Sequence, residues 1–156
     1  MDGTIADFYG SALALHGVPN LYDNLDNLGV YRAQEILQMT NREFWGPADD
    51  QKKFWPGLAK TVEADQIVDT AKALFGEKNC AILTAPSLNP ACVPGKREWV
   101  RRNYPELADR IIFTHNKEFL AGDGNVLFDD SDDMIEKFIV AGGIGVKVPR
   151  AWNNLH

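Results

Sequence analysis

The chain has 156 residues, of which 45% are hydrophobic and 24% are charged, and its formal net charge is −6. These values predict one globular domain with a sizeable apolar core and exclude an intrinsically disordered chain. The acidic balance argues against a nucleic-acid polymer as the partner, because such binding requires a basic surface. A small anionic ligand stays compatible with it, since a few local cations or a metal ion can reverse the sign of the potential within one site.

The cysteine content and the hydropathy pattern indicate where in the cell the protein is located. Cys80 and Cys92 lack C-x-x-C spacing and are too few for a disulfide framework. No apolar run approaches the ~20 residues of a membrane span, and the first residues lack the basic and apolar regions of a signal peptide. We therefore expect a cytoplasmic protein without membrane attachment.

The first half of the chain shows helical patterns and no convincing strand. Its predicted helices span residues 6–16, 30–38, 41–45 and 64–75. Gly17 and then Pro19 end the first of them, and Asn41 is the expected N-cap of the third. The helix at 64–75 has the clearest pattern, because apolar residues recur at helical spacing and Gly76 follows.

From residue 79 onward, short apolar runs alternate with helical patterns. The predicted strands span residues 80–83, 110–113, 126–128 and 144–148, and the predicted helices span residues 96–104 and 132–141. This alternation predicts the α/β class, a parallel sheet with helices on both faces, whose ligands bind beyond the carboxyl ends of the strands. We expect residues 8–62 to form a small helical cap inserted after the first strand, and residues 1–7 and 63–156 to form the core.

Asp2, Gly3 and Thr4 form the first candidate site. Phosphoryl transfer to a carboxylate requires an acid near the leaving oxygen and backbone N–H groups around the phosphate. Asp2 suits the acid and base role, and Gly3 allows the backbone to approach an anion closely. A simple turn followed by a helix cap explains the three residues equally well, because D-G-T is common in turns.

Thr84 and Lys117 follow two of the predicted strands. A hydroxyl at the carboxyl end of a strand can hold a phosphate oxygen without adding charge. A cation after the next strand would neutralise charge on a phosphoryl group during its transfer. Taken singly, each residue is also explained by an ordinary role, a polar loop residue for Thr84 and a solvated surface lysine for Lys117.

Asp129 and Asp130 follow the apolar run at 126–128. Adjacent carboxylates at the end of an apolar strand are costly unless a cation lies among them, and oxygen ligands suit Mg²⁺. The alternative is that Asp130, Ser131 and Asp132 cap the next helix. Both can hold, with Asp129 facing the metal and either Ser131 or Asp132 capping.

The order of these four groups resembles the motifs of haloacid dehalogenase superfamily phosphatases. The closer similarity is to the 5′(3′)-deoxyribonucleotidase family, and it covers essentially the whole chain. Residues 1–8 match the family's D-M-D-G-[TV]-[IL]-A-D-F motif from its second position, and residues 83–86 match its C-T-S-P segment. Further matches lie at residues 92–93, 96, 99–100, 110–117 and 127–130.

The resemblance implies a sheet of the haloacid dehalogenase type and a Mg²⁺-dependent 5′-nucleotidase that hydrolyses nucleoside monophosphates, particularly deoxyribonucleotides, through an aspartyl-phosphate. The family's first strand and nucleophilic Asp would precede Met1, so we expect very weak or no turnover from the 156-residue chain. Asp2 would be the acid and base, and Thr84 and Lys117 would hold the phosphoryl oxygens. The Mg²⁺ ligands would be Asp129 and Asp130 together with the nucleophilic Asp and the main-chain carbonyl of Asp2.

The resemblance also implies the substrate contacts. Gly3, Thr4 and Ala85 would border the phosphate, and Phe8, Phe54 and Trp55 would stack against the base. Packing inside the cap explains Phe54 and Trp55 equally well. Ala85 replaces the family's Ser beside the phosphate, so the substrate preference does not transfer.

Two other classes of function stay open. One is a non-catalytic nucleotide- or Mg²⁺-binding protein, and the other is a phosphatase of the same superfamily for a sugar phosphate or a polynucleotide end. The net charge and the aromatic-rich cap favour a small nucleotide over a polymer, and the sequence is compatible with a homodimer. The central expectation is that Asp2, Thr84, Lys117 and Asp129 converge around one divalent ion and one phosphoester.

Overall fold

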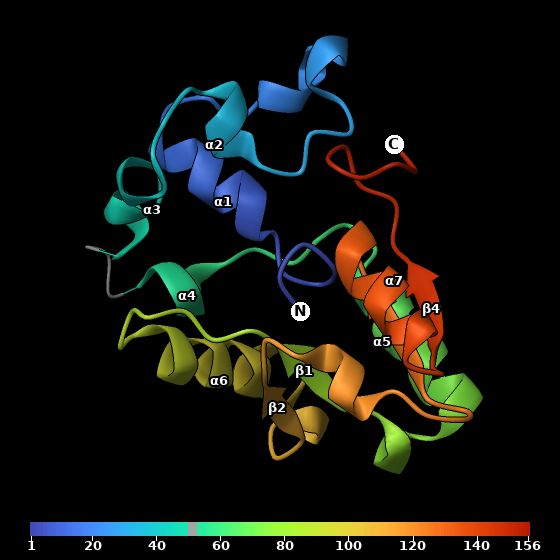
Figure 1. Cartoon of the computed structure of the whole chain (residues 1–156). Helices are drawn as coiled ribbons and strands as arrows, with labels where there is room; N and C mark the ends of the chain where they lie inside the picture. Colours follow the sequence, from blue (N-terminus) through green and yellow to red (C-terminus); the bar gives the residue numbers. More distant parts are fainter. Residues whose placement is uncertain (50–52) are drawn as a thin grey trace. The chain divides into compact units, whose positions relative to one another are not determined.

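The computed structural model describes residues 1–49 and 53–156 and divides into two compact units (Figure 1). Unit 1 comprises Met1–Ser11 and Ala48–His115, and unit 2 comprises Ala12–Pro47 and Asn116–His156. Helices α1 (Phe8–Leu15) and α3 (Asn41–Asp49) run across the boundary between them. Each unit combines helices with one pair of parallel strands, so the α/β class expected from the sequence is confirmed.

Unit 1 is built around strands β1 (Ile82–Thr84) and β2 (Ile111–Phe113), which run parallel with Thr84 opposite Phe113. The unit's other elements are α4 (Phe54–Gly57), α5 (Ala64–Phe75), η3 (Glu77–Asn79), α6 (Cys92–Asn103) and η4 (Pro105–Leu107). Ile82 and Thr84 are buried, as alternate residues of a strand that covers a core must be. Thr84 therefore ends β1 with its side chain inside the unit.

Helices α4 and α6 pack closely together in unit 1. Gly95 permits this approach, because a Cβ atom there would lie 2.5 Å from the Trp55 Cβ atom. Nearby, the fully buried Trp99 of α6 donates a hydrogen bond from its indole nitrogen to the Leu58 carbonyl oxygen, 2.7 Å away. The contact places the inner face of α6, which carries Lys96, in the core of the unit.

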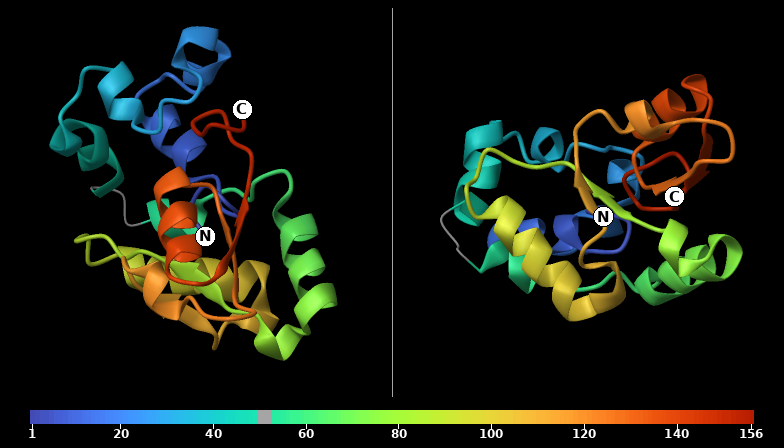
Figure 2. Two further views of the ribbon diagram at one scale, coloured as in Figure 1. Left: turned by 45° about the vertical axis from the view of Figure 1, so that its right-hand side comes forward. Right: turned by 90° about the horizontal axis from the view of Figure 1, so that it is seen from below.

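Unit 2 is built around strands β3 (Val126–Asp129) and β4 (Ile144–Lys147), which run parallel with Asp129 opposite Lys147. Helix α7 (Asp132–Val140) packs beside these strands (Figure 2). Its Ile135 and Phe138 side chains are buried. The remaining elements are η1 (Leu21–Asp23), η2 (Leu25–Asn27), α2 (Ala33–Ile36) and η5 (Lys117–Leu120). Because β3 leads directly into α7, the residues between them lie at the carboxyl end of the strand.

Several helix boundaries differ from those expected. The helix at 64–75 is confirmed as α5, whereas the helix expected at 30–38 is reduced to α2. The expectation that Asn41 caps α3 was wrong. Thr40 and Glu43 form a reciprocal cap instead: the Thr40 N–H donates to Glu43 Oε2 at 2.8 Å, and the Glu43 N–H donates to Thr40 Oγ1 at 3.3 Å. The Glu three residues after Thr40 provides the second half of this capping box.

The strands pair in parallel as expected, but the described residues form two separate two-stranded sheets, β1–β2 and β3–β4. A single sheet of the haloacid dehalogenase type therefore stays a prediction, as does the division into a cap at 8–62 and a core. The predicted cap includes residues 50–52, which lie outside the described part of the chain. Among the described helices, none combines the length and the apolar character required to cross a lipid bilayer.

Candidate functional site

A buried lysine joins the N-terminal turn to the end of β1 in unit 1. Lys96 is 2% exposed, and its Nζ atom donates to Asp2 Oδ2 at 2.5 Å, Thr84 Oγ1 at 2.9 Å and the Ala85 carbonyl oxygen at 2.7 Å. The Thr84 hydroxyl also donates to Asp2 Oδ2, at 3.1 Å. We refer to Asp2, Thr84, Ala85 and Lys96 as the Lys96 cluster. Its three strong acceptors account for the burial of an ammonium group.

The turn that carries Asp2 is held against β1 by main-chain hydrogen bonds. The Met1 amino nitrogen donates to the Leu83 carbonyl oxygen at 3.0 Å, and the Gly3 N–H donates to the Ala6 carbonyl oxygen at 2.9 Å. Gly3 has a φ of 69°, a value that glycine adopts at little cost. Thr4 is buried, and its carbonyl oxygen accepts a hydrogen bond from Thr61. The turn thus fixes the position of the Asp2 carboxylate relative to Thr84.

The two carboxylate oxygens of Asp2 have different surroundings. Oδ2 accepts hydrogen bonds from Lys96 and Thr84, whereas Oδ1 is buried and has no hydrogen-bond partner among the described residues. A buried acceptor without a partner is costly, by about 1–3 kcal/mol or more for a charged group. Oδ1 is therefore the atom of this cluster whose capacity to accept a hydrogen bond is unused among the described residues.

The three aromatic residues expected to contact a base form one cluster in unit 1. The Phe8 and Trp55 rings are stacked with centroids 5.4 Å apart, and the Phe54 ring meets the Phe8 ring edge-on at 5.9 Å. Phe54 and Trp55 are buried, as packing of these rings against one another requires. The Lys96 Nζ atom lies 4.9 Å from the centre of a Trp55 ring, and Trp55 Nε1 has no hydrogen-bond partner among the described residues. Stacking on a base stays a prediction.

In unit 2, Lys117 and Asp129 form a buried ion pair. Lys117 begins η5, Asp129 ends β3, and the Lys117 Nζ atom donates to Asp129 Oδ2. Asp129 is 2% exposed, and its Oδ1 atom accepts the Ser131 N–H at 3.0 Å. Two residues selected separately from the sequence are therefore in direct contact.

Asp130 lies in a different environment from Asp129. Its carboxylate is buried, and Oδ2 accepts a hydrogen bond from Trp152 Nε1 at 2.8 Å. Burial raises the pKa of Asp130, and the negative charge of Asp129 raises it further. Ser131 is the N-cap of α7, since its Oγ atom accepts the Met134 N–H. The expectation that Ser131 or Asp132 caps this helix is confirmed for Ser131.

The oxygen atoms of both groups are chemically suited to Mg²⁺. Asp129 and Asp130 supply buried carboxylates, and the main-chain carbonyl of Asp2 is the further oxygen ligand expected from the sequence. In the part of the chain that the structure describes, no three or more His, Cys, Asp or Glu side chains gather into a ready cage for a metal ion. Mg²⁺ does not require such a cage, because it commonly takes one or two carboxylates together with water and substrate phosphate.

The structure brings the expected site residues together in two groups. Asp2, Thr84 and Ala85 belong to unit 1, and Lys117, Asp129 and Asp130 belong to unit 2. The convergence of both groups on one ion stays a prediction.

Lys96 and Trp152 form hydrogen bonds with residues of these two groups, and neither is among the site residues predicted from the sequence. Lys96 had a detectable signal, because it shares a helix face with the apolar residues Cys92, Trp99 and Val100, where a lysine requires a buried partner. Trp152 had no comparable signal, because its partner Asp130 lies 22 residues away in the sequence and only the structure shows their hydrogen bond. Comparisons with models of protein families and with curated protein sequences find no match to this chain.

Proposed function

We propose that this chain is a phosphoric monoester hydrolase of the 5′-nucleotidase type, which requires Mg²⁺ and acts on nucleoside monophosphates, with deoxyribonucleotides as the first class to test. The Lys96 cluster is the observation that carries the proposal. It holds an acid, a hydroxyl and a cation within hydrogen-bond distance of one another at the carboxyl end of a parallel strand. This is the place where open α/β sheets bind ligands.

Asp2 is the proposed acid and base. Lys96 and Thr84 hold Oδ2, so Oδ1 is the oxygen that transfers the proton. A carboxylate oxygen attacks phosphorus, the ester P–O bond breaks, and Asp2 donates its proton to the leaving nucleoside oxygen. Asp2 then takes a proton from the water that attacks the aspartyl-phosphate, which releases inorganic phosphate and restores the attacking carboxylate and the protonated Asp2.

The attacking carboxylate is proposed to belong to a residue joined to the Met1 nitrogen. Met1 N bonds to the Leu83 carbonyl oxygen, so a residue attached to it would lie beside β1. Thr84 and Lys117 are proposed to hold the phosphoryl oxygens. When bound by Asp129, Asp130 and the main-chain carbonyl of Asp2, Mg²⁺ would offset the negative charge of the phosphoryl group.

Nucleotide recognition is assigned to the aromatic cluster of Phe8, Phe54 and Trp55. Aromatic rings hold bases of any sequence by stacking, at about 1–3 kcal/mol per base. The chain's net charge of −6 fits a small nucleotide better than a polymer. The reaction would belong to nucleotide metabolism in the cytoplasm.

The decisive experiment measures phosphate release with Mg²⁺ from nucleoside 5′- and 3′-monophosphates and from sugar phosphates. It compares the 156-residue chain with a chain extended upstream by an apolar strand that ends in Asp. We expect activity from the extended chain and very weak or none from the shorter one. Equal activity of the two would show that the assigned nucleophile is wrong.

Two controls separate the other classes of function. Asp2→Asn in the extended chain should lower turnover by roughly 10²–10⁴-fold, the contribution of a general acid and base. Nucleotide binding without turnover in the extended chain would favour a non-catalytic binding protein. Turnover of sugar phosphates alone would favour a different phosphatase.

A further inference from the structure

The last seven residues of unit 2 fold back as a hook, which we define as residues 150–156. Its Trp152 and Asn153 are buried, at 8% and 0% exposure. Trp152 Nε1 donates to Asp130 Oδ2 at 2.8 Å, and Asn153 Nδ2 donates to the Asp130 carbonyl oxygen at 2.9 Å. The hook therefore holds both the side chain and the main chain of Asp130.

The hook also contacts other segments of unit 2. The Gly29 N–H donates to the Ala151 carbonyl oxygen at 2.8 Å, and the Tyr22 and Trp152 rings pack with centroids 5.9 Å apart. Asn153 Nδ2 also donates to the Val148 carbonyl oxygen at 2.8 Å, directly after β4. The hook thus links the end of β3 to the end of β4 and to the segment that contains η1 and η2.

The position of Asp129 depends on its neighbours in this arrangement. Asp129 Oδ1 accepts the Ser131 N–H at 3.0 Å, and the Asp129 carbonyl oxygen accepts the Val148 N–H at 2.8 Å. Ser131 follows Asp130, so a rotation of the Asp130 main chain would move the Ser131 N–H away from Asp129. A donor that holds Asp130 therefore also orients the Asp129 carboxylate.

We infer that Trp152 and Asn153 are positioning residues for Asp129, which hold the β3 end in the orientation that binds Mg²⁺. The inference rests on the proposed function, in which Asp129 is a ligand of the ion. Partners that orient the ligands of a metal are typically worth about 10- to 100-fold in metal affinity. Trp152 and Asn153 have the contacts that this role requires, because each donates a hydrogen bond to Asp130, the residue between Asp129 and Ser131.

The first test follows hydrogen exchange of the Ser131 amide in the metal-free full chain. Trp152→Phe keeps a ring against Tyr22 but removes the indole N–H. We expect exchange at Ser131 to become about tenfold faster, the effect of a lost hydrogen bond to a charged group. Trp45→Phe, a matched removal of an indole from α3, should leave this rate unchanged. Asn153→Ser provides an independent second variant and should also accelerate exchange.

The second test measures the affinity of the same variants for MgCl₂ by calorimetry. Trp152→Phe and Asn153→Ser should bind Mg²⁺ about 10- to 100-fold more weakly than the wild type, while Trp45→Phe binds it equally well. Wild-type Mg²⁺ affinity in both hook variants would overturn the inference and leave the proposed function intact. Failure of the wild type to bind Mg²⁺ would count against the proposed function, and Ser131 exchange would then decide the inference by itself.

Discussion

The Lys96 ammonium group lies in the interior of unit 1, and its surroundings restrict what can replace it. A buried charge is tolerated only when partners compensate for its lost hydration. Removal of one member of a buried ion pair leaves the remaining charge without this compensation, which destabilises the fold. Among the residues that the structure describes, Lys96 has three oxygen partners, of which Asp2 Oδ2 is the only carboxylate oxygen. Both a structural and a chemical role for Lys96 therefore depend on Asp2.

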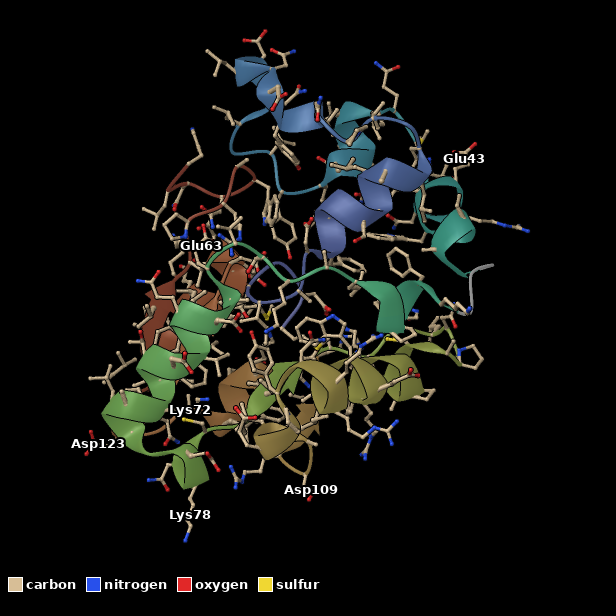
Figure 3. All side chains as sticks on the ribbon, turned by 180° about the vertical axis from the view of Figure 1, so that it is seen from behind. Glu43, Glu63, Lys72, Lys78, Asp109 and Asp123 are labelled. Atoms are coloured by element: carbon tan, nitrogen blue, oxygen red, sulfur yellow. The ribbon has the colours of Figure 1, made fainter. Side chains whose placement is uncertain are left out.

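Replacement of Lys96 by Met should destabilise the chain by about 1–3 kcal/mol, because Asp2 and Thr84 lose their charged donor. Urea denaturation would measure the change. Lys78→Met is the matched control, since Lys78 of η3 is exposed (Figure 3) and should change stability by less than about 0.5 kcal/mol. If Asp2→Asn removes most of the loss caused by Lys96→Met, the two side chains act as a pair. Equal stability of Lys96→Met and the wild type would contradict the buried position of Lys96.

Tyr22 provides a prediction for alkaline pH. Burial raises the pKa of Tyr22 from 10.0 to about 12, and its hydroxyl donates to the Val30 carbonyl oxygen at 2.8 Å. Since the folded chain retains this proton longer than the unfolded chain, the contribution of Tyr22 to the free energy of unfolding is complete below pH 10 and is lost as the pH rises from 10 to about 12.

Absorbance titration of phenolate formation, compared between the wild type and Tyr22→Phe, would isolate this group from the other tyrosines. The phenolate absorbance that the wild type shows and Tyr22→Phe lacks should appear near pH 12 in the folded chain. The stability of Tyr22→Phe should decline less steeply than that of the wild type between pH 10 and 12. If this absorbance instead appears at pH 10, the Tyr22 hydroxyl is solvated and not buried.

At the scale of elements, the contact between α4 and α6 depends on one glycine. A Cβ atom at Gly95 would lie 2.5 Å from Trp55 Cβ and 2.9 Å from Pro56 Cδ. Such distances require the helices to separate, and extra volume in a packed core typically costs about 1–3 kcal/mol. The gain of about 0.5–1 kcal/mol that alanine brings to a helix interior offsets only part of this cost.

Gly95→Ala should therefore lower the melting temperature, and it should also displace the Trp55 ring, which near-ultraviolet circular dichroism would detect. Gly57→Ala is the matched control at the end of α4, where an added Cβ meets no atom within 4 Å. That variant should keep the wild-type melting temperature within a few degrees or raise it. An unchanged or higher melting temperature for Gly95→Ala would show that α4 and α6 are less closely packed.

At the scale of the whole molecule, each sheet formed by the described residues has only two strands, a number that needs further packing for stability. In unit 2, α7 provides part of that packing, and the buried Lys117–Asp129 pair lies at the end of the β3–β4 sheet. A ligand that binds at this end and not to the unfolded chain would stabilise the entire folded state.

Mg²⁺ should therefore raise the melting temperature of the wild-type chain in a concentration-dependent manner. When the free Mg²⁺ concentration is 100 times the dissociation constant, the free energy of unfolding should increase by about 2.7 kcal/mol. Asp129→Asn should abolish the Mg²⁺-dependent increase, whatever its effect on the melting temperature without the ion. Asp123→Asn changes an exposed acid of the same unit (Figure 3) and should retain the increase. Thermal denaturation over a series of MgCl₂ concentrations would test this, and an equal increase in both variants would exclude Asp129 as a ligand.

The sequence by itself determined the local elements and the residues at their ends. Apolar spacing and Gly76 predicted α5 with the correct bounds, because these signals act within a few residues. Short apolar runs predicted strands that pair in parallel, and they correctly placed Thr84 and Asp129 at strand ends. The finer expectation of one sheet and a cap stays a prediction.

Only the tertiary structure decided which side chains meet. Lys96 reaches Asp2 across 94 residues of sequence, and Trp152 reaches Asp130 across 22. Local patterns contain no information on such pairs, because a distant partner is selected by how helices and strands pack and not by the spacing of neighbouring residues. For the same reason, only the structure could distinguish the two oxygens of Asp2, of which Oδ2 is held by Lys96 and Thr84 while Oδ1 has no hydrogen-bond partner among the described residues.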